Sequence, residues 1–283
     1  MRKWLIASAV LLAALAITVG VGFQTHLLPI ADIRPLPRAA NGVDYVLYVR
    51  APAACTPAHP CAAAYVLDGA AWTGQFEHAA DVAAQAGRAQ PIVIVGVGYV
   101  DIAGTAWRRK RDFTPNFGQT DSAPSTHATG GAAAFLHVLR DEIIPYAESH
   151  YPIDPRCRGL IAHSYAGLFA AYTLKRTPDL FDRYLIISPA LWFDNYHVFQ
   201  EQPAPTQPTT IALASDAKTQ GVSYMARDVE RYGDMLSGNA AFSASVHLYP
   251  GATHMSVVPL AFTDAIPLLY STNRDGPCGA SRK

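Results

Sequence analysis

The chain has 283 residues, and its 22 lysines and arginines balance its 22 aspartates and glutamates. A net charge of zero argues against a dedicated nucleic-acid-binding protein, which is normally basic overall. Half of the residues are hydrophobic and only 16% are charged, which argues against intrinsic disorder. The length suits one α/β domain that folds without a metal or disulfide staple. We therefore expect a globular enzyme or binding domain with no nucleic-acid partner.

The N-terminus has the pattern of an export segment. Arg2 and Lys3 precede an uncharged apolar stretch at residues 4–23, which is the order found in secretory signals. The stretch is long for a signal-peptide core and nearly long enough to span a bilayer, so a cleaved signal and an uncleaved anchor both stay open. An ordinary buried helix is the remaining alternative. We expect residues 1–23 to place the folded part outside the cytoplasm: periplasmic, tethered to the inner membrane, or secreted.

Four cysteines allow three disulfide pairings. Cys55 and Cys61 flank a short proline-rich loop and are near enough for a local bridge, which would leave Cys157 for Cys278. Disulfides are the natural state of cysteines in an oxidising compartment, and four buried free thiols are the alternative. A zinc site has little support because no C-x-x-C pair occurs. We expect neither a metal nor a cofactor.

Strand and helix patterns alternate through the rest of the chain. Residues 24–40 hold three prolines and few periodic apolar positions, which is typical of a linker. Apolar or β-branched runs predict strands at residues 43–50, 62–67, 91–99, 158–162, 184–187, 210–214 and 245–249, and helical patterns lie at 130–150, 165–176, 222–236 and 256–269. The uninterrupted apolar run at 91–99 is typical of a strand buried on both faces of a sheet.

This alternation predicts the domain organisation. Strands that alternate with helices form βαβ units, so we expect an α/β fold with a mostly parallel central sheet flanked by helices. One domain over residues 41–272 accounts for the pattern, and residues 273–283 follow it as a C-terminal tail.

The segment with the most chemical information surrounds Ser164. An apolar strand pattern ends in AHSYAG at residues 162–167, and a helical pattern follows. This strand–turn–helix context is that of the nucleophile elbow, G-x-S-x-G, in which small neighbours let the backbone pass close to a strained serine. Here the small neighbours are Ala162 and Ala166, and Gly167 comes one position later. Ser164 is therefore the predicted nucleophile.

A serine hydroxyl is a weak nucleophile until a base takes its proton, and an acid orients that base. In hydrolases with this elbow the chain order is serine, acid, histidine. His254 lies between the last strand pattern and the last helical pattern, so it is the predicted base. Asp216, just after the strand pattern at 210–214, is the predicted acid. Its rivals are Asp194 and Asp228, and a Ser–His dyad without an essential acid is the alternative.

Two loops complete the predicted site. The expected oxyanion hole combines the backbone N–H of Tyr165 with one from the loop after the strand at 62–67, at Gly69 or Ala70. Residues 100–130 are a long stretch containing glycine, serine and threonine, which we expect to be a loop and a lid over the pocket.

Cationic and aromatic residues predict how a ligand is held. Residues 108–111 (RRKR) follow a tryptophan, and Arg109 and Arg111 would attract an anionic aromatic ligand through charge and cation–π contact. Trp72 and Trp192 follow strand patterns on the catalytic side and are expected to line the pocket. The alternatives are a solvated basic loop and tryptophans that belong to the core.

With these residues in place, the chain resembles the esterase family of α/β-hydrolases that includes enterochelin and related siderophore esterases as well as mycolyl-type acyltransferases. The resemblance rests on YVLDG (65–69), RDFTP (111–115), FL…DEIIPY (135–146), AHSYAGLF (162–169) and PDLFDRY…ISPALW (178–192), and it covers most of residues 43–270. It implies the α/β-hydrolase fold, Ser164 as nucleophile and His254 as base. It also implies an acidic residue, often glutamate, where Asp216 stands. The periplasmic siderophore-esterase branch is the most similar, because an export segment accompanies the same core.

The leading hypothesis is an exported, monomeric serine hydrolase that cleaves carboxylic esters of a small molecule through an acyl-enzyme. Trilactone siderophores are the substrates that the resemblance implies, and membrane contact is expected only through residues 1–23. Two alternatives stay open. One is an acyltransferase on the same fold. The other is a catalytically silent binding protein, which the two alanines of the elbow would favour.

Overall fold

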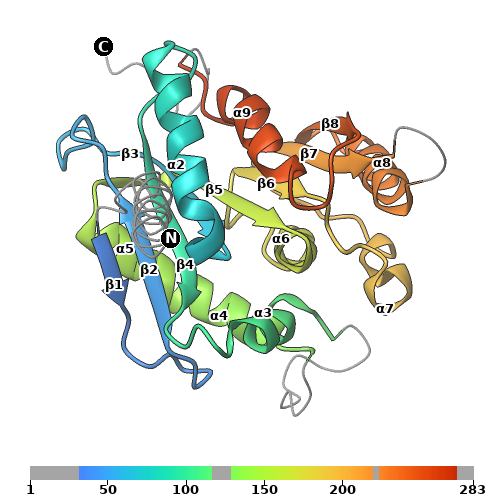
Figure 1. Cartoon of the computed structure of the whole chain (residues 1–283), viewed down its shortest axis with the longest axis horizontal. Coiled ribbons are helices and arrows are strands. Elements are labelled where there is room, and N and C mark those ends of the chain that lie inside the picture. Colours follow the sequence, from blue (N-terminus) through green and yellow to red (C-terminus); the bar gives the residue numbers. More distant parts are fainter. Residues whose placement is uncertain (1–31, 117–128, 219–222, 273–283) are drawn as a thin grey trace, which may run out of the picture.

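The apolar runs of the sequence become the strands of one eight-stranded sheet in the computed structural model, which describes residues 32–116, 129–218 and 223–272 (Figure 1). The strand order is β1-β2-β4-β3-β5-β6-β7-β8. The strands are β1 Asp32–Pro35, β2 Tyr45–Arg50, β3 Cys61–Leu67, β4 Ile92–Tyr99, β5 Ile153–His163, β6 Arg183–Ile187, β7 Thr209–Ala217 and β8 Phe242–Pro250. β1, β2 and β4 pair antiparallel, and the pairings from β4 through β3 to β8 are parallel.

Helices cover both faces of this sheet. They are α2 Gly69–Gln85, α3 Thr105–Phe113, α4 Ala132–Val138, α5 Ile144–His150, α6 Tyr165–Arg176, α7 Phe193–Tyr196, α8 Tyr224–Ser237 and α9 Val257–Leu269, with a π-helical turn at Leu139–Ile143 and a 3₁₀ turn at His197–Phe199. α2 and α9 pack on one face, where the rings of Phe76 and Phe262 lie 5.1 Å apart. α4, α5, α6 and α8 pack on the other face, where Phe169 and Val229 are buried. The predicted α/β class is confirmed.

The alternation of side chains along β3 and β4 shows why these strands are apolar throughout. Tyr65 and Leu67 of β3 join the core on the α6 side, whereas Ala64 and Val66 join the core under α2 and α9. β4 is buried along its whole length, as the run at 91–99 predicts. A strand covered on both faces has no side that can be polar.

Two segments differ from the expectation. Residues 32–35, placed in a linker by the sequence, form β1, which pairs antiparallel with β2 at the edge of the sheet. β1 is mostly exposed, so it lacks the apolar alternation that marks a strand. The stretch at 100–130, expected as a loop, contains α3. Only Asp112 and Phe113 of this cation-rich helix are buried, so its sequence lacks the apolar stripe that indicates a core-facing helix.

The predicted local disulfide is confirmed. Cys55 and Cys61 are bonded, and their Cα atoms lie 5.4 Å apart. Cys157 is buried and also disulfide-bonded, whereas Cys278, its predicted partner, lies outside the described residues. The predicted export segment at 1–23, most of the predicted linker and the tail at 273–283 lie outside them as well. Within the described ranges, no helix is long and apolar enough to cross a bilayer.

Candidate active site

Ser164 occupies a strained turn between β5 and α6. Its backbone has φ 62° and ψ −120°, a combination that a non-glycine residue adopts only where the surrounding structure enforces it. Two hydrogen bonds supply that constraint: the Ser164 N–H donates to the Ile187 carbonyl at 3.0 Å, and the Ala190 N–H donates to the Ser164 carbonyl at 3.1 Å. The turn is thus tied to the end of β6 and has the geometry of the predicted nucleophile elbow.

The elbow tolerates its two alanines because the tightest contact falls elsewhere. Ala162 and Ala166 are fully buried, so their methyl groups are accommodated in the packing. A Cβ added at Gly167 would come within 3.0 Å of the Cα and Cβ atoms of Pro189. The close approach between the start of α6 and the chain after β6 therefore depends on Gly167, one position beyond the usual glycine of the motif.

The structure places His254 and Asp216 together at the same edge of the sheet. His254 lies in the loop between β8 and α9, and its Nδ1 is 3.6 Å from Oδ1 of Asp216, near the end of β7. This distance is longer than a hydrogen bond but within ion-pair range. The rivals lie apart from this contact, Asp194 in α7 and Asp228 in α8.

Ser188 holds the same carboxylate, a role that the sequence analysis missed. Its Oγ donates to Oδ1 of Asp216 at 2.7 Å, and the Asp216 N–H donates back to that Oγ at 3.3 Å. Ser188 follows β6 directly, is fully buried and has φ 39°. The signal that points to it is its place in ISPALW, at the carboxyl end of a parallel strand, where ligand-facing loops gather.

His163 is a buried neutral histidine at the centre of the site. Only 5% of it is exposed, and its ring lies 5.6 Å from that of Trp72 and 4.4 Å from that of His254. Burial, followed by the neighbouring His254, lowers the pKa of His163 to about 3. The ring is therefore uncharged throughout the neutral and mildly acidic range.

This shift predicts a pH-dependent stability. An unfolded histidine titrates near pH 6.5, so below that pH the unfolded chain binds a proton that folded His163 refuses, and the free energy of unfolding falls. From pH 7 to pH 5 this one group removes about 2 kcal/mol of stability. In His163→Phe that loss should be absent, so urea unfolding at the two pH values should show a smaller pH effect than in the wild type. An identical pH effect in both proteins would contradict the assignment.

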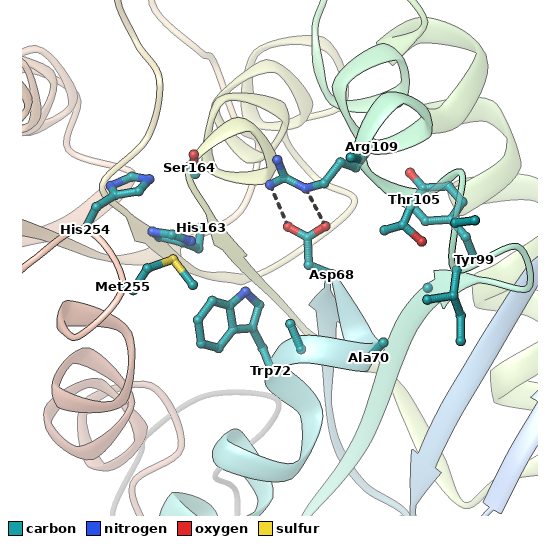
Figure 2. A pocket seen from close by; sticks show the side chains of 15 residues that line it. Asp68, Ala70, Trp72, Tyr99, Thr105, Arg109, His163, Ser164, His254 and Met255 are labelled. Carbon is teal, nitrogen blue, oxygen red and sulfur yellow. Dashed lines mark hydrogen bonds and ion pairs between the residues drawn. The ribbon is translucent and has the colours of Figure 1, made fainter.

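Ser164, His163 and His254 line one cavity of about 610 Å³ (Figure 2). Its other walls are largely apolar and come from the start of α2, the end of β4, the loop that follows it, α3 and the β8–α9 loop; they are Asp68, Ala70, Ala71, Trp72, Gly98, Tyr99, Ile102, Ala103, Thr105, Ala106, Arg109 and Met255. A concave apolar site with a few convergent polar groups is the usual form of a small-molecule pocket. Helix α3 thus supplies a wall where the sequence suggested a loop lid.

The two ends of α2 and α6 nearest the nucleophile carry the expected oxyanion donors. Tyr165 is the first residue of α6, directly after Ser164. Gly69 is the first residue of α2, and a Cβ there would come within 2.6 Å of the Gly96 backbone. Gly69 is therefore needed for close packing of α2 on β4, and Ala70 is the neighbour that lines the cavity.

The expected ligand-binding cations have different surroundings. Arg109 lines the cavity, but its guanidinium already donates to both Asp68 oxygens at 2.8 Å and lies 5.8 Å from the Tyr165 ring (Figure 2). Arg111 is not among the lining residues. Its Nε donates to the buried carboxylate of Asp112 at 2.7 Å. A buried carboxylate needs a counter-charge, so Arg111 serves the packing behind the wall.

The two tryptophans predicted to line the pocket, Trp72 and Trp192, also differ in their surroundings. Trp72, on α2, lines the cavity and packs against His163. Trp192 is not among the lining residues: it is 46% exposed, and its ring lies 6.3 Å from that of Tyr165. In the part of the chain that the structure describes, no cluster of three or more His, Cys, Asp or Glu could hold a metal ion.

The family described as "Putative esterase" matches residues 39–225, which is more than half of the chain. The chain belongs to this esterase family. Its curated relatives include the ferri-bacillibactin esterase BesA of Bacillus subtilis, 25% identical over 271 residues that cover 88% of this chain and 92% of BesA. The family makes this protein a carboxylic-ester hydrolase, which confirms the coarser part of the sequence prediction.

Solved structures of esterase-family members agree on the fold. The crystal structure of the BES protein from Bacillus cereus superposes with a TM-score of 0.73 and 25% identity, covering 84% of this chain and 95% of that one. The siderophore hydrolase EstA from Aspergillus nidulans superposes with a TM-score of 0.69 at 20% identity, covering 84% and 93% of the two chains. The α/β-hydrolase fold expected from the sequence is confirmed.

Proposed function

We propose that this esterase is a serine hydrolase with Ser164 as nucleophile, His254 as general base and Asp216 as the acid that orients His254. The observation that carries the proposal is the strained Ser164 at the wall of the cavity that His254 also lines. The carboxylate of Asp216 supports it, since it lies 3.6 Å from His254 Nδ1 and can stabilise the charge that His254 acquires.

The chemistry follows from these positions. Ser164 Oγ attacks the ester carbonyl and passes its proton to Nε2 of His254, which forms a tetrahedral intermediate. The backbone N–H of Tyr165 and one at Ala70 or Gly69 stabilise the negative oxygen. The intermediate collapses as the alcohol leaves with the proton from His254. Water, deprotonated by His254, then attacks the acyl-enzyme carbonyl. The second tetrahedral intermediate collapses as Ser164 Oγ leaves with the proton from His254, which releases the carboxylic acid and restores the free serine.

The proposed substrate class is a trilactone siderophore ester. The name of the Bacillus subtilis relative, a ferri-bacillibactin esterase, supports this class. The cavity offers Trp72 and Tyr99 as aromatic walls, and Arg109 as a cation beside the nucleophile. Aromatic rings would meet stacking surfaces there, and acidic hydroxyls on them would approach the Arg109–Asp68 ion pair. Arg111 and Trp192, also predicted from the sequence to contact the ligand, do not line this cavity, so the proposal for the pocket rests on Trp72, Tyr99 and Arg109.

The proposed location is outside the cytoplasm, in the periplasm or tethered to the inner membrane. The Cys55–Cys61 disulfide supports an oxidising compartment. Residues 1–23, with their two leading cations and apolar stretch, support export. We propose a monomer that contacts a membrane through these residues alone, if they are retained.

The proposal is tested by substrate hydrolysis. The purified protein is incubated with a catecholate trilactone and with short-chain aryl esters, with and without excess glycerol, and products are separated chromatographically. We expect ring opening of the trilactone to linear acids and no glycerol ester. Activity on short esters alone would contradict the substrate class, and accumulation of glycerol esters would favour acyl transfer.

Two matched tryptophan variants separate ligand contact from general damage. Trp72→Phe replaces an indole that lines the cavity by a smaller phenyl ring, and Trp192→Phe makes the same change at a residue that does not line it. For the trilactone, we expect a higher KM in Trp72→Phe and an unchanged KM in Trp192→Phe. Equal effects would argue against the cavity as the ligand site.

A further inference from the structure

A row of three rings leads from α2 to the proposed base. Trp72, His163 and His254 follow one another, with ring centroids 5.6 Å and 4.4 Å apart, and the two histidine rings are tilted by 42°. Figure 2 shows His163 between Trp72 and His254. His163 ends β5, a central strand, whereas His254 lies on a loop, so the row connects the loop to the rigid sheet.

A polar contact strengthens this connection. The backbone of His254 faces the His163 ring and raises the pKa of that ring, as an acceptor does, against the larger effect of burial. Nε2 of His163 is buried without a hydrogen-bond partner among the described residues, so Nδ1 is the nitrogen that we assign to this contact. Each of the two contacts, ring on ring and Nδ1 to backbone, restrains the residue that must receive the serine proton.

The restraint is needed because the carboxylate does not supply it alone. His254 Nδ1 lies 3.6 Å from Asp216 Oδ1, beyond hydrogen-bond distance, and that oxygen already accepts the Ser188 hydroxyl at 2.7 Å. We propose that His163 is a positioning residue, holding the imidazole of His254 toward Ser164 by ring contact and by the polar contact of its Nδ1 with the His254 backbone. This inference rests on the proposed role of His254 as base.

The electrostatics of the pair fit this role. The charged or titratable groups that face His163 are His254 from the β8–α9 loop, Arg109 from α3 and Asp216 from β7. His254 becomes positively charged in each catalytic cycle, and a second charge 4.4 Å away would oppose that step. A buried ring that stays neutral can keep its contact with His254 in both protonation states.

Three variants test the inference. His163→Ala removes both contacts, His163→Phe keeps the ring without the donor, and His163→Asn keeps an N–H at the Nδ1 position without the ring. Since a misplacement of ~1 Å can cost ~100-fold in rate, we expect kcat to fall about 100-fold in the alanine variant while KM changes little. The phenylalanine and asparagine variants should each recover part of that loss, about 10-fold. His247→Ala, an exposed residue of β8, is the matched control with wild-type kcat.

The outcomes are distinguishable. Thermal unfolding shows whether each variant is folded, and if His163→Ala is not, the other two decide, since each should still have a lower kcat than the wild type. Wild-type kcat in folded variants, or recovery in neither phenylalanine nor asparagine, would overturn the positioning role. His254→Ala is measured beside them: if it too keeps full activity, the proposed base is wrong and the inference fails with it.

Discussion

Ser164→Ala is expected to lower ester hydrolysis by about 10⁴- to 10⁶-fold, because removal of the nucleophile leaves only the contribution of binding and the oxyanion hole. The same variant should lose covalent labelling by a fluorophosphonate, which reacts with an activated serine hydroxyl. Ester hydrolysis and labelling are measured on one preparation. Hydrolysis is measured as the initial rate on an aryl ester, and labelling as the mass of the intact protein.

The loss should be chemical and not structural. Alanine keeps the Cβ of serine, so the strained backbone at φ 62° and its two hydrogen bonds to the chain around β6 are unchanged. The unfolding midpoint should therefore match that of the wild type. Ser149→Ala, an exposed position on α5, is the control and should keep full rate and labelling. Equal labelling of Ser164→Ala and wild type would refute the assignment of the nucleophile.

Local patterns in the sequence were sufficient to predict the central parallel sheet and the turn at Ser164. β4 could be predicted from an unbroken apolar run because burial on both faces excludes polar residues. Ser164 could be predicted because a strained turn requires small neighbours at fixed spacing. The closeness of His254 to Asp216 could be predicted from chain order, since parallel strands end at one edge and their loops meet there.

Contacts between segments that are far apart in the sequence could not be predicted from local patterns. Ser188 and Asp216 are 28 positions apart, and only the adjacent β6 and β7 bring the hydroxyl to the carboxylate. Arg111 was predicted to bind the ligand because it belongs to a run of four cations beside a tryptophan, and nothing in that run showed that the adjoining Asp112 would be buried and accept from it. α3 was missed for a related reason: most of its residues are polar or cationic and only half-buried, so the sequence lacks the apolar positions that indicate a helix.

The elbow and the proposed base, His254, are held by two different mechanisms. Ser164 is fixed by backbone hydrogen bonds to residues after β6, so its position follows from the sheet itself. His254 is on a loop and depends on side-chain contacts with His163 and Asp216. Substitutions around His254 should therefore lower kcat in gradual steps, whereas the elbow should tolerate little change at Gly167.

His254→Ala is expected to lower kcat by about 10³- to 10⁵-fold, since without a base the Ser164 hydroxyl keeps its proton. The loss should be larger for alkyl esters than for nitrophenyl esters, because an alkoxide leaving group needs the proton that His254 returns, and nitrophenolate does not. Initial rates on both ester classes measure this difference. A uniform loss would show that His254 does not act as the general acid.

Asp216→Asn is expected to lower activity less than His254→Ala does. The 3.6 Å distance to His254 Nδ1 and the Ser188 hydroxyl on the same oxygen make the carboxylate a weaker partner than in a tightly bonded triad. We therefore expect a smaller loss than in His254→Ala, about 100-fold, because the negative charge that stabilises the imidazolium is gone while His163 still holds the ring. Activity near the wild-type level would make the site a Ser–His dyad. A loss as large as that of His254→Ala would show that the carboxylate closes on His254 during the reaction.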